Sequence, residues 1–222
     1  MIRDILIKDT FTIIILSLIF IITLIRYNNR EKFNSLIKIF WNNFYLKKHK
    51  NQKIQYSLFN CLLQINFIIS LGLFVFVFKS IYNENGFSLN FLEYLDIIQV
   101  ILTFFILKTV AELIISWFFG IKQLINLYLN EKINYNGLIG LIILGINVLI
   151  LYYFNPSINI LFFFISLILL LKLTGYMNSF ILHKKSIQKN WFYFILYLCT
   201  LEIIPYLLLY NFFLPILGGY YI

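Results

Sequence analysis

Short polar segments divide the sequence into six apolar stretches, each long enough or nearly long enough to cross a lipid bilayer as a helix. A membrane-spanning helix needs ~20 mostly apolar residues. The six stretches cover residues 10–25, 57–78, 94–119, 137–154, 158–177 and 191–214. The chain is 61% hydrophobic and 12% charged, whereas soluble domains are about half apolar and about a quarter charged. These features predict an all-α, polytopic membrane helix bundle, with residues 1–222 as a single integral membrane domain.

The first apolar stretch could instead be a signal peptide, which has a positively charged start and a small-residue cleavage site. Arg3 and Lys8 are balanced by Asp4 and Asp9, and no Ala-x-Ala-like site follows. We therefore expect the first stretch to remain as a membrane span.

Basic residues are distributed unevenly between the two sides of the predicted bundle. If all six stretches cross the bilayer, one side receives thirteen: Arg26, Arg30, Lys32, Lys38, Lys47, Lys48, Lys50, Lys53, Lys122, Lys132, Lys184, Lys185 and Lys189. The other side receives three, namely Arg3, Lys8 and Lys79. Cytoplasmic loops carry an excess of Lys and Arg, so both termini are predicted to be periplasmic. The net charge of +9 follows from these loops and does not indicate nucleic acid binding.

The first cytoplasmic loop contains an amphipathic stretch over residues 33–46. Its apolar side chains recur at helical spacing: Phe33, Leu36, Ile37, Phe40, Trp41 and Phe44. The lipid or partner contacts predicted for this loop are Trp41, Lys47, Lys48, Lys50 and Lys53. An apolar face beside a basic cluster is typical of an interfacial helix over anionic headgroups. Topological anchoring is the simpler interpretation, and a docking surface for a cytoplasmic protein is the other. Residues 118–130 are a second candidate interfacial segment.

Four ionisable residues lie inside the apolar stretches: Lys108, Glu112, Lys172 and Glu202. A charge at the centre of a membrane helix costs ~2.5–3.5 kcal/mol on insertion scales, so such residues normally face the bundle interior and pair. Lys108 and Glu202 lie near the middle of their stretches, whereas Glu112 and Lys172 lie about one turn nearer the cytoplasm. The sequence therefore predicts that the third, fifth and sixth spans pack around two ion pairs, Lys108–Glu202 and Lys172–Glu112.

This charge cluster has two interpretations. It can be a fully paired device that specifies helix packing, because polar groups often hold membrane helices together. It can also be a proton or ion relay or a site for a charged substrate. Lys172 could alternatively extend its ammonium to the interface, and Lys108 could pair with Glu112 on its own helix. Pro205 follows Glu202 by three residues and can loosen the helix there.

Small and neutral polar residues mark the fourth apolar stretch. Gly137, Gly140 and Gly145 would allow close approach of a neighbouring helix, although their spacing is not a strict GxxxG motif. Asn147 is a candidate further member of the charge cluster, since a neutral polar group at this depth can hydrogen-bond across helices.

Signals for enzymatic chemistry are weak. Cys61 and Cys199 lie in separate spans, and His49 and His183 lie in basic loops, so no His/Cys metal site is expected. The sequence contains no Walker loop, GxGxxG, HExxH or GxSxG motif. We expect no metal, no cofactor and no enzymatic activity of a familiar hydrolytic type.

The last apolar stretch carries a resemblance to a known family. Residues 192–210 read FYFILYLCTLEIIPYLLLY, with Glu202 and Pro205 at their centre. This segment resembles the closing segment of domain of unknown function 4271, a family of multi-span inner-membrane proteins. The resemblance extends to Phe33-Asn34 and to Lys108 and Glu112. It implies an inner-membrane location and no established activity.

Two functions remain open on the sequence. The first is a non-enzymatic structural, assembly or accessory component of an inner-membrane complex, which works through an unidentified protein partner. The second is a small ion- or proton-coupled transporter that uses Lys108, Glu112, Lys172 and Glu202. No internal repeat is evident, and many transporters are built from repeats, so the first function is favoured.

Overall fold

The computed structural model describes residues 2–38, 58–82, 91–118, 120, 122–153 and 158–189. Every regular element in these ranges is a helix: α1 (Ile2–Asn28), α2 (Arg30–Ile37), α4 (Leu58–Tyr82), α5 (Phe91–Phe118), α6 (Lys122–Tyr152) and α7 (Ile158–Lys189). Five of them contain a stretch long and apolar enough to cross a membrane: Thr10–Asn28, Leu58–Ile81, Phe91–Phe118, Tyr128–Tyr152 and Ile158–Gly175. The predicted all-α bundle is confirmed, while the sixth stretch, 191–214, lies outside the described residues.

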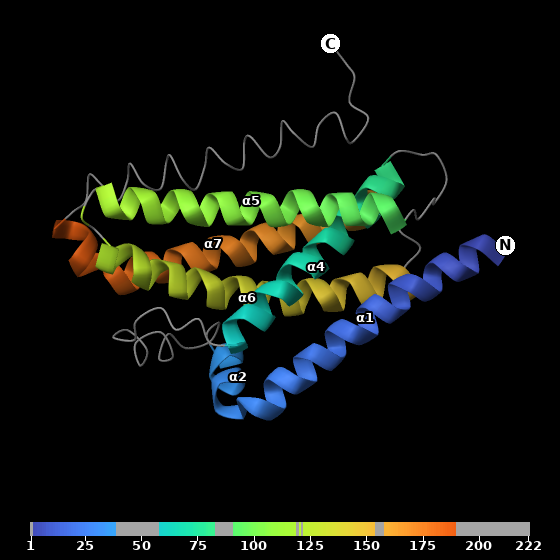
Figure 1. Cartoon of the computed structure of the whole chain (residues 1–222), viewed down its shortest axis with the longest axis horizontal. Coiled ribbons are helices and arrows are strands. Elements are labelled where there is room, and N and C mark those ends of the chain that lie inside the picture. The colour runs from blue at the N-terminus through green and yellow to red at the C-terminus, as the bar shows by residue number, and fades with distance from the viewer. Residues whose placement is uncertain are drawn as a thin grey trace, which may run out of the picture.

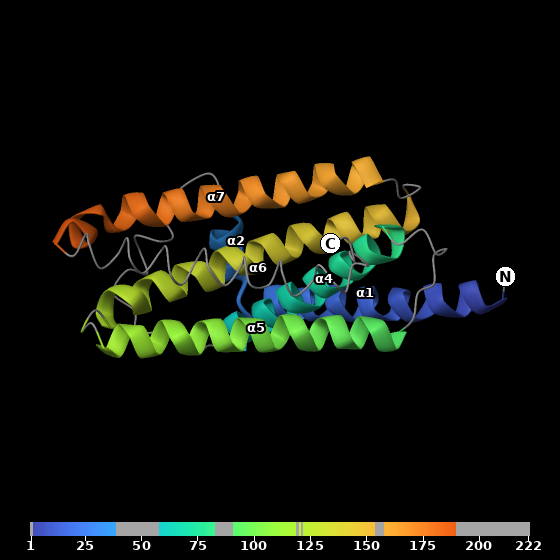
Figure 2. The ribbon, with the colours of Figure 1, turned by 90° about the horizontal axis from the view of Figure 1, so that it is seen from above.

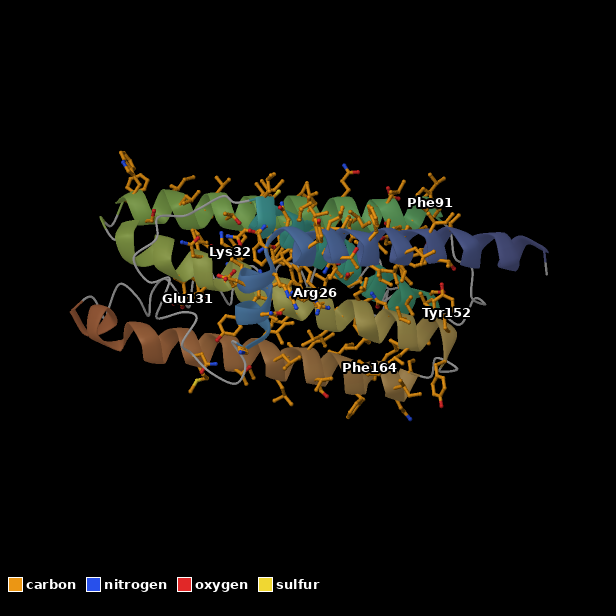
Figure 3. All side chains as sticks on the ribbon, turned by 90° about the horizontal axis from the view of Figure 1, so that it is seen from below. Arg26, Lys32, Phe91, Glu131, Tyr152 and Phe164 are labelled. Atoms are coloured by element: carbon orange, nitrogen blue, oxygen red, sulfur yellow. The ribbon has the colours of Figure 1, made fainter. Side chains whose placement is uncertain are left out.

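The five long helices run along one axis, and each runs opposite to the long helix before it (Figure 1). Seen from above, α6 lies between α5 and α7 (Figure 2), and α4 crosses α6 obliquely in the most extensive helix contact of the described residues. Arg26 and Lys32 lie in the half of the bundle where α6 begins, which we call the basic end, and Phe91 and Tyr152 lie at the opposite end (Figure 3). The helix order therefore places the described basic segments of the first loop and of α6 toward one end.

Glycines allow α4 and α6 to approach closely. A Cβ atom added at Gly137 would lie 3.1 Å from Leu63 Cβ, and one added at Gly140 would lie 2.7 Å from Phe67 Cα. The latter contact is with backbone, which cannot move aside as a flexible side chain can. The predicted close approach is confirmed for these two glycines. Gly145 is exposed, and the described ranges place no such neighbour within 4 Å of it.

Helix α6 differs most from its predicted extent. It begins at Lys122, and its apolar stretch begins at Tyr128 rather than at residue 137. Residues 122–130 are therefore its first turns and do not form a separate interfacial helix. The predicted span begins too late because Asn130, Glu131 and Lys132 resemble a loop, yet all three are at least partly buried in the bundle. At the other end, α7 continues to Lys189, beyond the predicted limit of the fifth span.

The predicted interfacial helix is described only in its first part. Helix α2 follows α1 after a break at Asn29, which has φ −137° and ψ 56°. Phe33 and Leu36 do not lie on an open apolar face; they are buried with Ile25 and Tyr135 in a core cluster that joins α1, α2, α4 and α6. These side chains therefore hold α2 to the bundle. Trp41, Lys47, Lys48, Lys50 and Lys53 lie outside the described residues.

Aromatic side chains form the core near the opposite end. The Phe11 ring stacks on Phe76 with centroids 5.3 Å apart, and it meets Tyr94 edge-on at 5.5 Å. Tyr94 also donates a long hydrogen bond of 3.5 Å to the Ile69 carbonyl of α4. Edge-on and offset ring contacts are favourable. This cluster joins α1, α4 and α5.

Candidate functional site

A tight turn sets α5 against α6 at the basic end. Gly120 has φ +65°, a left-handed conformation that glycine adopts without steric cost. Its N–H donates to the Trp117 carbonyl at 3.3 Å, which closes the last turn of α5. The chain then reverses directly into α6 at Lys122. Residues shortly before and shortly after Gly120 are consequently brought to the same depth in the bundle.

Glu112 and Lys132 form an ion pair across this α5–α6 hairpin. Lys132 Nζ donates to Glu112 Oε1, and the two side chains are 11% and 0% exposed, respectively. Lys108 lies one turn from Glu112 along α5 and is 4% exposed. Because opposite charges at this depth stabilise each other against the loss of water, the pair holds α5 and α6 in one register.

The sequence predicted Lys172 as the partner of Glu112, whereas the structure gives Glu112 an ion pair with Lys132. The cation bonded to Glu112 is Lys132 of α6, a residue that the sequence analysis assigned to a loop. The Lys172 ammonium lies instead 5.9 Å from the centroid of the Phe67 ring of α4, at the outer limit of a cation–π contact. The physical reason is the early start of α6, which places Lys132 between α5 and α7 at the depth of Glu112.

The second predicted pair is Lys108 with Glu202. Lys108 is buried in α5 as expected. Glu202 and Pro205 lie outside the described residues, so the pair stays a prediction.

A small cavity lies between α6 and α7 beside the ion pair. Its volume is about 20 Å³, and its lining consists of Tyr128, Lys132, Tyr135, Asn136, Ile139, Lys172 and Gly175. A site of this size can hold one water-sized species. Gly175 allows the Tyr135 ring to approach α7 closely, because a Cβ atom added at Gly175 would lie only 3.1 Å from that ring. The cavity can therefore accommodate a single small polar species but not an organic substrate.

A separate set of amides lies where α4 crosses α6. Asn147 Nδ2 donates to the Ser70 carbonyl at 2.8 Å, and both residues are buried. Asn66, one turn before Ser70, is fully buried, and its carboxamide finds no hydrogen-bond partner within the described ranges. Asn147 follows Lys132 by fifteen positions, about 22 Å along the helix axis. The structure therefore places Asn147 against α4, about four turns from Lys132, and a contact with Glu202, which lies outside the described residues, stays a prediction.

Lys132, Asn136 and Asn66 are polar residues of the bundle interior that the sequence analysis did not select. A signal for the first two existed: Tyr128, Lys132 and Asn136 lie four positions apart and continue the buried face on which Gly140 lies. This i, i+4 pattern is helical. The pattern was missed because adjacent charged residues such as Glu131 and Lys132 lower the local hydrophobicity, and a segment of low hydrophobicity is assigned to a loop.

The chemical capacity of this site is electrostatic. Within the described part of the chain, no group of three His, Cys, Asp or Glu side chains could hold a metal ion. Many hydroxyl side chains bond to their own helix, as Ser116 does to the Leu113 carbonyl at 2.6 Å and Thr109 to the Phe105 carbonyl at 2.8 Å. Glu112, Lys132, Lys172 and Lys108, together with the buried Glu131, are thus charged groups with which this part of the bundle can bind or move a charge.

Comparison with known proteins gives one family. A family model described as a domain of unknown function, DUF4271, matches residues 11–213. No match was found among curated proteins or among solved structures. The matched range contains all five long helices except the first turns of α1.

Proposed function

Because the chain belongs to the DUF4271 family, whose description assigns no activity, we propose a function from its charges and packing. The protein is a multi-pass inner-membrane component without enzymatic activity, which serves as a structural, assembly or accessory subunit of a membrane complex. Five helices long and apolar enough to span a membrane are the basis for the multi-pass location.

The observation that supports this proposal most is the buried Glu112–Lys132 pair. It joins two consecutive helices across a tight turn, and Glu112 is completely buried. A charge that must be relayed or exchanged needs access to water or to a substrate. The cavity beside this pair, about 20 Å³ among the described residues, has room for one water-sized species and not for an organic substrate. The pair is therefore best explained as a device that sets helix register.

The outer helices supply surface for a partner within the membrane. Large apolar side chains are exposed on α1, α5 and α7: Leu16, Phe20, Ile106, Leu107, Leu169 and Leu170. Lipid covers such surfaces, and an apolar membrane protein can replace it. We expect the partner to be an integral membrane protein of unknown identity, and the bilayer to contribute anionic headgroups at the basic end.

A double variant tests the structural role directly. Replacing a buried ion pair by apolar residues of similar size is often neutral for stability. We expect Glu112→Leu/Lys132→Met to retain normal protein level and to complement cells that lack the protein. The matched control is Lys132→Met alone, which leaves Glu112 buried with its observed cation removed and should lower the protein level. A stable double variant that fails to complement would contradict the structural role.

Affinity purification tests the partner. The full chain is tagged and isolated from native membranes after crosslinking, with an unrelated multi-pass protein of similar size as the control. We expect a specific integral membrane protein to copurify in fixed ratio. Recovery of the chain without any specific protein would contradict an accessory role.

Ion- or proton-coupled transport is the second candidate function. It is favoured by one observation, the two lysines that line the cavity beside Glu112, namely Lys132 and Lys172. Flux into proteoliposomes should then depend on Glu112 and on Glu202, which the sequence places near the middle of the last span. Equal flux in the parent and in Glu202→Gln proteoliposomes would remove this candidate.

Orientation is a further part of the proposal. The excess of Lys and Arg at the basic end supports a cytoplasmic position for that end and periplasmic termini. Reporter fusions at the N-terminus and after Lys189 test it. We expect only the first fusion to be active with a periplasmic reporter.

A further inference from the structure

Three buried polar side chains, which we call the amide cluster, lie where α4 crosses α6 (Figure 1). Asn66 and Ser70 are fully buried, and Asn147 is 1% exposed. Asn66 and Ser70 are four positions apart and therefore lie on one face of α4. Asn147 of α6 reaches Ser70 through the hydrogen bond from its Nδ2 to the Ser70 carbonyl at 2.8 Å. Ser70 thus lies next to both amides.

Four polar atoms of the amide cluster have no hydrogen-bond partner among the described residues. They are Asn66 Oδ1, Asn66 Nδ2, Ser70 Oγ and Asn147 Oδ1. Other hydroxyls of the bundle bond to a carbonyl of their own helix, as Thr103 does to the Gln99 carbonyl at 2.8 Å, but Ser70 Oγ does not. Buried polar atoms of side chains nearly always have a partner. Four unpaired atoms in one place therefore indicate a polar species between the two helices.

The depth of the amide cluster separates it from bulk water. Ser70 lies near the middle of the apolar stretch Leu58–Ile81, about 17 Å along the helix axis from either end. Lipid offers no hydrogen-bond partner at this depth, so each unsatisfied polar group is costly there. A partner for these atoms has to be held inside the bundle.

The unpaired atoms define the chemistry of that partner. A carboxamide oxygen accepts hydrogen bonds, a carboxamide nitrogen donates them, and a hydroxyl does both. A cation would leave Asn66 Nδ2 unpaired, and an anion would leave the two carboxamide oxygens unpaired. Either ion would also bring a charge to mid-membrane depth, which is costly. Water is neutral, both donates and accepts, and typically makes about three hydrogen bonds when it is buried.

We propose that the amide cluster binds ordered water between α4 and α6. The water donates to the two carboxamide oxygens, accepts from Asn66 Nδ2 and bonds to the Ser70 hydroxyl. Lipid cannot replace hydrogen bonds of this kind, so the hydrated crossing holds α4 to α6 in addition to the close approach at Gly140. This binding site lies inside the bundle and is independent of the proposed accessory function.

Solid-state NMR of the full chain in lipid bilayers, with isotope-labelled asparagine nitrogen, tests the proposal. Magnetisation is transferred from water to the side-chain amides, and a water-soluble paramagnetic ion then suppresses the contribution of bulk water. The Asn66 signal is identified as the one that Asn66→Leu removes, or Asn66→Ser if the first variant does not fold. We expect transfer to Asn66 to persist with the ion present.

Asn34 is the matched control, because it is exposed on α2 and should lose its transfer when the ion is added; Asn34→Ser identifies its signal. If Asn66 receives no transfer even without the ion, the side chains pair directly with each other. If the ion removes the transfer, Asn66 is open to bulk water. Either result would overturn the proposal.

A further variant locates the water. Ser70→Ala removes the hydroxyl and retains both carboxamides, so the transfer to Asn66 should fall. The matched control is Ser17→Ala, since Ser17 Oγ donates to the Ile14 carbonyl on an exposed face of α1 at 2.7 Å; its transfer to Asn66 should equal that of the parent. A parental transfer in Ser70→Ala would show that the water does not lie beside Ser70 and would overturn the site.

Discussion

The two halves of α6 pack by different means. In the half of its apolar stretch nearer the basic end, Tyr128 to Gly140, Lys132 is paired with Glu112, Gly137 lies against the Leu63 side chain, and Gly140 lies against the backbone of α4. In the other half, aliphatic side chains such as Ile143 and Ile150 fill the core, with a single amide contact from Asn147. Lipid tails are as apolar as these side chains, so apolar burial alone gives little preference for helix contact over lipid. The comparison teaches that the basic half carries most of the specificity of packing.

The largest effect is expected at the ion pair. Lys132→Met leaves the buried Glu112 carboxylate with its observed cation removed, so the free energy of unfolding should fall by about 3–5 kcal/mol. Denaturant unfolding in micelles measures this loss. The charge-reversed variant Glu112→Lys/Lys132→Glu should recover part of it. If Lys132→Met lowers the free energy of unfolding by less than about 1 kcal/mol, which is the range of exposed ion pairs, the two halves of α6 do not differ in packing specificity as stated.

Close helix approach should rank second. Gly140→Ala places a methyl group 2.7 Å from Phe67 Cα, and overpacking of this kind costs about 1–3 kcal/mol. Gly145→Ala is the matched control in the same helix, since no atom lies near its added Cβ. The free energy of unfolding of the control should equal that of the parent or exceed it by up to about 1 kcal/mol, because Ala favours the helix more than Gly does. Similar losses in both variants would show that the contact with α4 does not set the cost at Gly140, and would contradict the ranking.

The amide contact in the other half should matter less. Asn147→Leu removes the hydrogen bond to the Ser70 carbonyl, and interhelical hydrogen bonds in membranes average about 0.6 kcal/mol. The free energy of unfolding should therefore change by less than in Gly140→Ala. Leu149→Ala, at an exposed position of the same helix, serves as the control. A loss above about 2 kcal/mol would place packing specificity in both halves and contradict the ranking.

The smallest effect is expected for Lys79 and Glu93. Their ion pair spans 3.5 Å, and the Glu93 side chain is 41% exposed. Exposed pairs contribute about 0–1 kcal/mol and are screened by salt. Lys79→Gln should lower the unfolding midpoint only slightly, and less at high salt than at low salt. A loss comparable to that of Lys132→Met would mean that burial does not separate the two ion pairs.

The local sequence pattern was sufficient to predict the class of fold and part of the candidate site. The lengths of the apolar stretches located the five described long helices, and the cost of buried charge selected Lys108 and Glu112, which are both buried. Gly137 and Gly140 were identified because glycine permits close approach of helices. These properties depend on residue type and spacing along one helix, which a sequence contains.

The partners of the buried polar residues depended on how neighbouring helices are placed relative to each other. Counting from helix ends paired Glu112 with Lys172, but the start of α6 at Lys122 brought Lys132 to Glu112. No apolar count can detect this, because a charged residue looks the same in a loop and in a paired, buried helix turn. The position of Asn147 against Ser70 and the exposure of Gly145 also follow from how α4 crosses α6.

The sequence by itself therefore determined that this chain forms an all-α bundle with long apolar helices and buried charge. Hydrophobicity and the cost of an unpaired charge act on each helix separately, so they can be read along the chain. Only the tertiary structure decided which cation meets Glu112 and where a cavity lined by Lys132, Asn136 and Lys172 is left. Those outcomes depend on the depth, rotation and crossing of neighbouring helices, which are set by contacts between residues far apart in the sequence.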